Sequence, residues 1–440
     1  MIKIRIIALK FTFILLATLI SSIAFAEAIP SEKTFKPSAL EQMALNFITE
    51  HKLPGTSIAV AYQGKIIFST GFGFAELPSE ENNFVGQVAS PSSLYRIASI
   101  SKPITAIAIM QLVENKKLKL SDKVVDVLKL EPFLEGNATP DPRWKEITIE
   151  QLLRHRGGFD RNKSFDAMFR SVTIANAMKK PSPASQEDVL RYMMGKPLDF
   201  NPGEKFAYSN LGYCILGRII EKISAMTYND YVQNNIFKPL DIYEIKPGRS
   251  LKSNRLTNEV VYYPPNPSKV KSVFPPYDLV DSSYGSNDHE SLDSVGGWVA
   301  SARALVKLAS SLDDNSLRRV LGKEATATMF SKSDAKPELD KEGKPLPNYY
   351  GLGWNVRPVG QANANTWHNG SLSGTSTLLV RRHDGYTWAV LFNGSKDKSP
   401  QPSTVIDALM HKTIDSMQAS ITETSFSEPV RLKRLRINRD

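Results

Sequence analysis

The chain contains a single cysteine, Cys214, among its 440 residues, so it cannot form a disulfide bond within itself. Cys214 lies in the apolar run Leu-Gly-Tyr-Cys-Ile-Leu, where a cysteine packs as a small hydrophobic side chain. Small folds that depend on disulfides are therefore excluded. The stability of this protein must come from a large hydrophobic core, which a chain of this length can bury.

Signals for metal and nucleic-acid binding are also scarce. The run Asp288-His289-Glu290 offers three possible metal ligands, but adjacent residues rarely face one ion and no second cluster joins them. We expect a solvated loop there. No stripe of basic residues interleaved with aromatic residues is present, which argues against a nucleic-acid partner. The sequence predicts no metal and no cofactor.

The sequence also lacks a Gly-x-Ser-x-Gly motif, the strand-to-helix turn that presents the nucleophile in α/β-hydrolases. A Ser-His-Asp triad that uses His155 and Asp160 would need such a serine. We expect instead that His155 closes a helix and orders the loop that leads to Gly158.

The first 26 residues have the layout of a secretory signal. Basic residues at positions 3, 5 and 10 precede an apolar stretch over 11–23, and Ala-Phe-Ala at 24–26 is a small-x-small cleavage site. The apolar stretch is short for a membrane span. We expect cleavage after Ala26 and a periplasmic or secreted protein, with an uncleaved anchor as the alternative.

The formal charge of +10 is concentrated at the two ends of the chain. The first 26 residues hold three basic and no acidic residues, and residues 431–440 hold five basic and one acidic. The remaining body is near +3, which is ordinary for a soluble enzyme. We expect the tail at 419–440 to be solvated, with weak contact to an anionic membrane or cell-wall polymer as the alternative.

β-Hairpin patterns occur near both chain ends, and the middle of the chain is helical by pattern. The predicted hairpin strands are 57–62 with 66–72, and 376–382 with 386–393. Amphipathic or apolar periodicity predicts helices over 38–51, 102–116, 148–155, 186–195, 209–225, 301–312 and about 403–417.

These patterns imply an α/β (α+β) fold in one domain over 27–418. Its antiparallel sheet would be built from both chain ends, about 38–98 and 349–418, and flanked by the terminal helices. A mostly helical lobe, about 99–330, would be inserted between them. Within the chain, the Pro-, Tyr- and Ser-rich stretch 262–292 is expected to rim a substrate cleft. The charged stretch 332–348 is expected to be an exposed excursion.

A Ser-x-x-Lys pattern at Ser99 is the first candidate for chemistry. A serine hydroxyl needs a base within hydrogen-bond reach, and residues three apart share one face of a helix. The pattern occurs four times, at Ser99, Ser268, Ser333 and Ser395. Only Ser99 opens a helix that is apolar on nearly every side, whereas the others lie in loop-like sequence. The sequence therefore predicts Ser99 as the nucleophile and Lys102 as its partner.

Tyr208 and Asn210 form the only Tyr-x-Asn in the chain. A tyrosine, with an ordinary pKa of about 10, becomes a general base if a neighbouring ammonium such as that of Lys102 favours its phenolate. Alternatively, Lys102 loses its own proton because it is desolvated. We expect the pair to share the proton transfer, so that no single pKa describes either group. A third interpretation is structural: this segment caps the helix at 209–225, and Tyr208 only packs.

A third segment, Trp-His-Asn-Gly-Ser at 367–371, leads into the strand of the second hairpin. Gly370 would let a substrate approach the strand backbone closely. The N–H of Ser371 would then pair with that of Ser99 as an oxyanion hole, in which one donor is worth ~3–4 kcal/mol. The alternative is a plain turn into a strand, with His368 on the surface.

Together these segments resemble the serine β-lactamase and penicillin-binding protein superfamily, in particular class C β-lactamases, D-Ala-D-Ala carboxypeptidases and related esterases. The resemblance extends from about residue 40 to 415. It includes Leu-Tyr-Arg-Ile-Ala at 94–98, Gln-Leu-Leu-Arg-His-Arg-Gly-Gly at 151–158, Gly-Gly-Trp at 296–298 and Tyr-Gly-Leu-Gly-Trp at 350–354.

The resemblance implies a β-lactamase-like fold and a role for each motif residue. Ser99 would be the acylated nucleophile, with Lys102 and Tyr208 as the proton-transfer pair. The implied substrate-binding residues are Asn210, His368, Asn369, Gly370 and Ser371.

One departure from the family pattern bears on the substrate. Many members carry Lys-Thr-Gly where this chain has His-Asn-Gly at 368–370. A histidine, with a pKa of about 6.5, is mostly neutral at pH 7, so a fixed positive charge is lost. We therefore expect a carboxypeptidase or esterase rather than an efficient β-lactamase.

The expected function is that of an exported serine hydrolase that cleaves an amide or ester through a Ser99 acyl-enzyme. Candidate substrates are peptidoglycan-like peptides, small esters and β-lactams. The alternative is a catalytically silent penicillin- or peptidoglycan-binding module with the same fold.

Overall fold

The computed structural model describes residues 38–81 and 83–421. The predicted signal at 1–26 and most of the basic tail lie outside the described residues. Among the helices of the described part, none combines the length and apolar character needed to cross a membrane.

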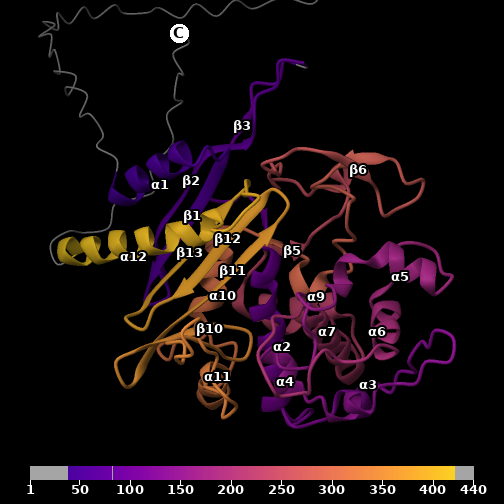
Figure 1. Ribbon diagram of the computed structural model, residues 1–440. Helices are drawn as coiled ribbons and strands as arrows, with labels where there is room; N and C mark the ends of the chain where they lie inside the picture. Colours follow the sequence, from indigo (N-terminus) through magenta and orange to yellow (C-terminus); the bar gives the residue numbers. More distant parts are fainter. Residues whose placement is uncertain (1–37, 82, 422–440) are drawn as a thin grey trace, which may run out of the picture. The chain divides into compact units, whose positions relative to one another are not determined.

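Within the described residues, an eight-stranded antiparallel sheet has the order β3-β2-β1-β13-β12-β11-β10-β9. Its strands come from both chain ends, as predicted, and β1 and β13 join the two halves in the middle of the sheet (Figure 1). The strands are β1 (Gly55–Tyr62), β2 (Lys65–Glu76), β3 (Gln87–Val88), β9 (Tyr349–Tyr350), β10 (Asn355–Val359), β11 (Asn363–Leu372), β12 (Thr375–Arg381) and β13 (Tyr386–Phe392).

Both predicted hairpins are confirmed. In the β1–β2 turn, Gln63 and Gly64 have φ of 48° and 77°, the two positive values that a two-residue turn matching the strand twist requires. The β12–β13 hairpin turns through His383-Asp384-Gly385, as predicted.

Two helices from opposite chain ends, α1 (Ala39–Glu50) and α12 (Pro402–Ile421), cover one face of the sheet (Figure 1). Alternate residues of β13 explain this, because Trp388 and Val390 point into the core beneath these helices. The helix residues that share this core include Leu40, Phe47, Ile406, Met410 and Ile414.

The opposite face of the sheet packs against α10 (Ala302–Ser310). The sequence grouped this helix with the helical lobe at about 99–330, whereas its packing places it on the sheet. Small residues that face this side, among them Ala59 and Ala389, belong to the same core as α10 and leave room for a helix to approach.

The helical lobe forms around α2 (Ser101–Glu114), which is buried on almost every side, as its uniformly apolar sequence predicted. The other helices of the described chain are α3 (Val124–Leu128), α4 (Ile149–Leu153), α5 (Ser171–Ala177), α6 (Gln186–Met194), α7 (Asn210–Ser224), α8 (Tyr228–Val232), α9 (Asp293–Gly296) and α11 (Lys323–Phe330). Short 3₁₀-helices are η1 (Ala98–Ile100), η2 (Pro142–Glu146), η3 (Ala167–Phe169), η5 (Lys238–Leu240) and η6 (Lys252–Asn254), and η4 (Gln233–Phe237) is a π-helical turn.

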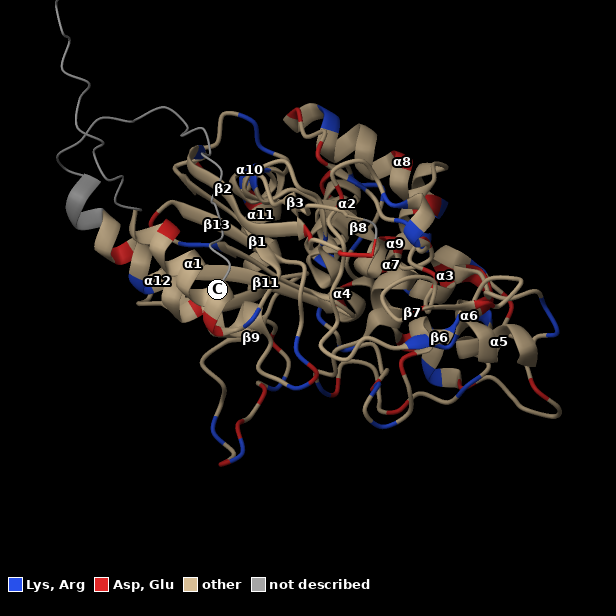
Figure 2. Cartoon of the chain, turned by 90° about the horizontal axis from the view of Figure 1, so that it is seen from above, with Lys and Arg blue, Asp and Glu red and all other residues tan. Residues whose placement is uncertain are grey.

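Two smaller sheets complete the described fold. β4 (Tyr95–Arg96), β8 (Trp298–Ala300) and β5 (Ile245–Pro247) form the first, and β6 (Lys269–Lys271) and β7 (Leu279–Asp281) the second. The stretch 332–348 is mostly exposed, as predicted. Lys and Arg residues are interspersed with Asp and Glu residues along the described chain (Figure 2).

Replacing Met410 with alanine tests the packing of α12. We expect the free energy of unfolding to fall by about 2–5 kcal/mol, because the side chain is fully buried beneath the helix. Leu409→Ala, one residue earlier and 40% exposed, is the matched control and should change it by about 0.5 kcal/mol or less. Urea unfolding followed by tryptophan fluorescence measures both. Equal losses would contradict this packing.

Candidate active site

Ser99 lies in η1, directly before α2, and is partly exposed while the residues on either side of it are buried. The segment before it is anchored by β4, which pairs with β8, and by a hydrogen bond from the Ile97 N–H to the Trp298 carbonyl at 3.0 Å. Ala98 has a positive φ of 47°, which is uncommon for a residue other than glycine. Such backbone strain persists only where the surroundings hold it, and here it turns Ser99 toward the surface.

Lys102 lies one helical turn after Ser99 and is completely buried. Its Nζ is 3.2 Å from Ser99 Oγ, 2.8 Å from Asn210 Oδ1 and 3.0 Å from the carbonyl oxygen of Val295. Burial lowers the pKa of Lys102 to about 7. At neutral pH much of Lys102 is therefore the free amine, which can accept the proton of Ser99.

Tyr208 completes the group predicted from the sequence. The Lys102 Nζ lies 4.9 Å from the centre of its ring, and the Ser99 side chain acts to lower the pKa of its hydroxyl. Burial raises the pKa of Tyr208 above its usual value, and the smaller effect of Ser99 opposes this only in part. Burial of Tyr208 therefore acts against the interpretation in which the ammonium favours a phenolate. The directions of the two pKa shifts favour the interpretation in which Lys102 loses its proton.

The capping role and the site role of the Tyr-Ser-Asn segment are both present. Ser209 caps α7, because its hydroxyl accepts the N–H of Gly212 at 3.2 Å. Asn210, the first residue of α7, uses both ends of its carboxamide: Oδ1 accepts from Lys102, and Nδ2 donates to Asp166 Oδ2 at 2.6 Å. The cap fixes the backbone that carries these side chains.

His155 contributes to the site in a way that the sequence did not indicate. It follows α4 with a positive φ of 55°, and its Nδ1 accepts the N–H of Ser209 at 3.1 Å. Its ring centre lies 4.2 Å from that of Tyr208. Asp160 instead pairs with Lys205 at 2.9 Å, so no Ser-His-Asp triad forms. His155 thus packs against the Tyr208 ring and holds the backbone of the next residue, Ser209.

The third motif lies on β11, where His368 is buried rather than on the surface, so the surface interpretation is wrong. Its Nδ1 lies 2.7 Å from the Asn369 carbonyl, which only accepts, so Nδ1 carries the hydrogen. Its Nε2 then accepts from the Tyr350 hydroxyl at 2.9 Å. Burial, reinforced by Lys102, lowers the pKa of His368 to about 3. His368 is therefore neutral and supplies no fixed positive charge.

Gly370 brings β11 against the nucleophile segment. A Cβ at this position would lie 2.2 Å from the Ile97 carbonyl oxygen and 3.1 Å from the Ala98 Cβ. Thr377, the partner of Gly370 on β12, donates a hydrogen bond to the same Ile97 oxygen at 3.1 Å. Gly370, the residue before Ser371, therefore lies against Ile97 and Ala98, which lead to Ser99. Its pairing with the Ser99 amide as an oxyanion hole remains a prediction, as does substrate binding by the exposed Asn369.

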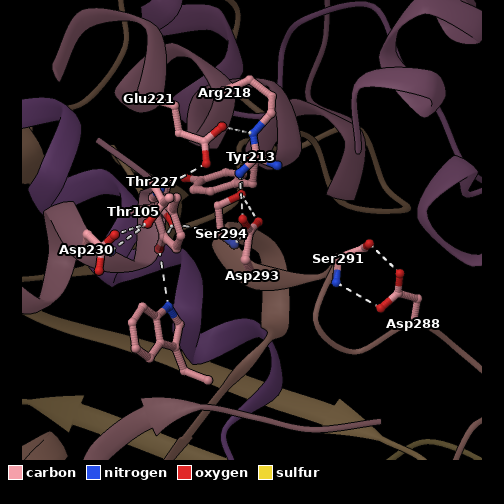
Figure 3. Close-up of polar contacts among 12 residues, drawn as sticks. Thr105, Tyr213, Arg218, Glu221, Thr227, Asp230, Asp288, Ser291, Asp293 and Ser294 are labelled. Carbon is pink, nitrogen blue, oxygen red and sulfur yellow. Dashed lines mark hydrogen bonds and ion pairs between the residues drawn. The ribbon is translucent and has the colours of Figure 1, made fainter. Parts of the chain in front are cut away.

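A polar network behind the site holds α9 against α2 and α7 (Figure 3). Arg218 of α7 forms an ion pair with Asp293 of α9 at 2.5 Å. The neighbouring Ser294 donates to the Tyr213 carbonyl at 2.9 Å, and its own carbonyl accepts from Thr105 at 2.6 Å. This network fixes the Val295 carbonyl that receives the Lys102 hydrogen bond.

A small hollow with a cavity volume of about 30 Å³ lies at the end of β11. Leu372 and Ser373, which follow Ser371, line one side, and residues between Ser282 and Leu292 line another. The stretch 262–292 therefore contributes to the rim of a hollow. The expectation of a solvated loop at 288–290 is wrong for His289, which is buried. Among the described residues, no group of three or more His, Cys, Asp or Glu side chains is arranged to hold a metal ion.

The other Ser-x-x-Lys patterns lie in loops, as expected. Ser268 is exposed, and Ser333 and Ser395 are half-buried outside any helix or strand. The Ser395 hydroxyl accepts the Gly374 N–H at 3.0 Å, which gives it a structural role.

The Beta-lactamase family model matches residues 40–409. The chain belongs to this family. This is the serine β-lactamase and penicillin-binding protein superfamily that the three motifs indicated.

Among curated proteins, the chain is 26% identical over 389 residues to Protein flp of Staphylococcus aureus (strain MRSA252). The matched region covers 86% of this chain and 68% of that protein. It spans 64% of the length of another Protein flp, from strain N315.

Two solved structures share the fold. The octameric penicillin-binding protein homologue from Pyrococcus abyssi has a TM-score of 0.62 and 24% identity, covering 86% of this chain and 77% of that chain. The D-amino acid amidase from Ochrobactrum anthropi SV3, complexed with L-phenylalanine amide, has a TM-score of 0.64 and 17% identity, covering 87% and 98%.

Gly370→Ala tests the contact between β11 and the nucleophile segment. Because the new methyl group would overlap the Ile97 carbonyl, we expect β11 to move and the rate of Ser99 acylation to fall on the order of 10²-fold, as for a misplacement of about 1 Å. Gly212→Ala, whose Cβ would meet its neighbours at 3.6 Å or more, is the control and should leave the rate unchanged. Acylation at the normal rate in Gly370→Ala would show that this contact does not position the site.

Proposed function

We propose that this protein is an exported serine hydrolase that cleaves an amide or ester bond through an acyl-enzyme on Ser99. One observation carries the proposal: a partly exposed Ser99 hydroxyl lies 3.2 Å from the Nζ of Lys102, a buried lysine whose pKa is about 7. The proposal of export rests on the signal-like sequence at 1–26. We further propose a periplasmic or secreted location, and a weak contact of the basic tail with the membrane or cell wall.

The reaction begins when Ser99 Oγ attacks the substrate carbonyl carbon while its proton passes to the neutral amine of Lys102. The carbonyl oxygen becomes an oxyanion, which the amides of Ser99 and Ser371 stabilise. Collapse of this intermediate breaks the bond to the leaving group. Tyr208, whose burial favours the protonated hydroxyl, delivers a proton to the leaving atom and is reprotonated by the neighbouring Lys102. Water then releases the acyl group by the reverse sequence.

The substrate classes that fit are peptidoglycan-like peptides, small esters and β-lactams. The neutral, buried His368 offers no cation to a substrate carboxylate, which favours peptidase or esterase activity over efficient β-lactam turnover. The fold shared with a D-amino acid amidase is consistent with an amide substrate.

Covalent labelling tests the nucleophile. Incubation with a fluorophosphonate or a fluorescent penicillin should give one adduct, on Ser99, by mass spectrometry. Ser99→Ala should lose it, and Ser268→Ala, in a competing Ser-x-x-Lys pattern, should keep it. Absence of an adduct from both probes would support the silent binding module instead.

The pH dependence of hydrolysis tests the base. We expect kcat/KM for an uncharged p-nitrophenyl ester to rise with pH through about 7 and then level off, because only the deprotonated amine of Lys102 accepts the proton of Ser99. Subtracting the Ser99→Ala rate removes background hydrolysis. A rate independent of pH between about 5 and 9 would exclude Lys102 as the base.

A further inference from the structure

We propose that Asp166 and Arg161, in the loop between α4 and α5, form a positioning pair that orients the Asn210 carboxamide against Lys102 and tunes the readiness of Lys102 to accept the Ser99 proton. The inference rests on the proposed function, which it deepens. None of the three sequence motifs contains either residue.

The first step of the argument is the orientation of Asn210. The Asp166 carboxylate only accepts hydrogen bonds, so the carboxamide atom 2.6 Å from it must be the Nδ2 donor. Oδ1 is then directed at the Lys102 Nζ, 2.8 Å away. A reversed carboxamide would place its N–H donors against the Nζ of Lys102, which donates to Asn210, and its oxygen against the Asp166 carboxylate. Asp166 thus selects the orientation that holds Lys102.

The second step is the way in which the loop holds Asp166. Its carboxylate also accepts the N–H of Met168 at 3.3 Å, which begins η3, and it lies 3.8 Å from Arg161 Nη1. The Asp166 side chain is 18% exposed, so solvent screens its charge only in part. The Arg161 guanidinium lies 4.9 Å from the centre of the Tyr208 ring. The pair therefore contacts the side chains on both sides of Ser209.

The third step concerns charge. Tyr208, Tyr213, His155 and His368 surround Lys102, and burial keeps both tyrosines protonated and both histidines neutral. Within the described structure, the charges that most affect the pKa of Lys102 are those of the pair. Asp166 raises the pKa of Lys102 and Arg161 lowers it, against the larger effect of burial.

The two charges therefore predict opposite effects. Asp166→Asn keeps an oxygen that can accept from Asn210 but removes the negative charge, so the rise of kcat/KM with pH should move to lower pH. Arg161→Gln should move it to higher pH. A shift on the order of one pH unit is expected for Asp166→Asn, and a smaller one for Arg161→Gln, because the Arg161 side chain is 44% exposed and solvent screens its charge. Asp166→Ala, which also removes the acceptor, should lower kcat below that of Asp166→Asn.

Controls come from the same loop. Asp160→Asn removes a carboxylate that pairs with Lys205, and Arg170→Gln removes an exposed guanidinium; neither should move the profile. Circular dichroism confirms that each variant is folded. Unmoved profiles in Asp166→Asn and Arg161→Gln, or shifts in the same direction, would overturn the inference.

A second readout needs no turnover. In protein labelled with ¹³Cε-lysine, the Lys102 signal, assigned by its loss in Lys102→Arg, follows the protonation of this amine directly. Its midpoint should fall in Asp166→Asn and rise in Arg161→Gln, and equal midpoints in both variants and the wild type would overturn the inference. These midpoints test the pair even if the wild type hydrolyses no ester, a result that would count against the proposed function alone.

Discussion

The burial of the Lys102 amine is the constraint on which the rest of the site depends. An ammonium in a fully buried position is unfavourable, so the pKa falls to about 7 and the neutral amine becomes available. The amine is not isolated, because Ser99, Asn210 and the Val295 carbonyl surround its Nζ. Each of these partners comes from a different part of the chain, so the chemistry exists only when the helical lobe is fully packed.

This dependence explains the polar network around α9. Arg218, Asp293 and Ser294 do not touch Ser99, yet their contacts fix the short helix whose Val295 carbonyl faces Lys102. On the strand side, too, a residue that does not react fixes the backbone of the site, because Gly370 allows β11 to touch the Ile97 backbone. A fold that keeps a titratable amine in its core accepts a cost in stability in return for reactivity.

Much of this arrangement could be predicted from local sequence. The uniformly apolar run after Lys102 distinguished Ser99 from three other Ser-x-x-Lys patterns, and alternating patterns located both hairpins of the sheet. Such signals are local, since a helix or strand periodicity is complete within about ten residues. The sequence predicts the helix at 301–312 correctly but assigns it to the helical lobe, whereas it packs on the sheet. Periodicity does not say which surface an apolar helix face will cover.

The contributions of Asp166, Arg161 and His155 could not be predicted in the same way. Asp166 and Arg161 lie in an irregular loop, where no periodicity relates sequence position to direction. The sequence predicts His155 at the end of a helix, but its ring contact with Tyr208 joins segments 53 residues apart. The protonation of Tyr208 was also open, because the balance between burial and a nearby charge depends on depth in the fold.

A crystal structure of the protein after phosphonylation by a fluorophosphonate tests the central claim most directly. The account predicts phosphorus bonded to Ser99 Oγ, with a phosphonyl oxygen within hydrogen-bond distance of the Ser99 and Ser371 amides and the Lys102 Nζ beside Oγ. A structure in which Lys102 is turned away from Oγ, or in which that oxygen faces neither amide, would contradict it.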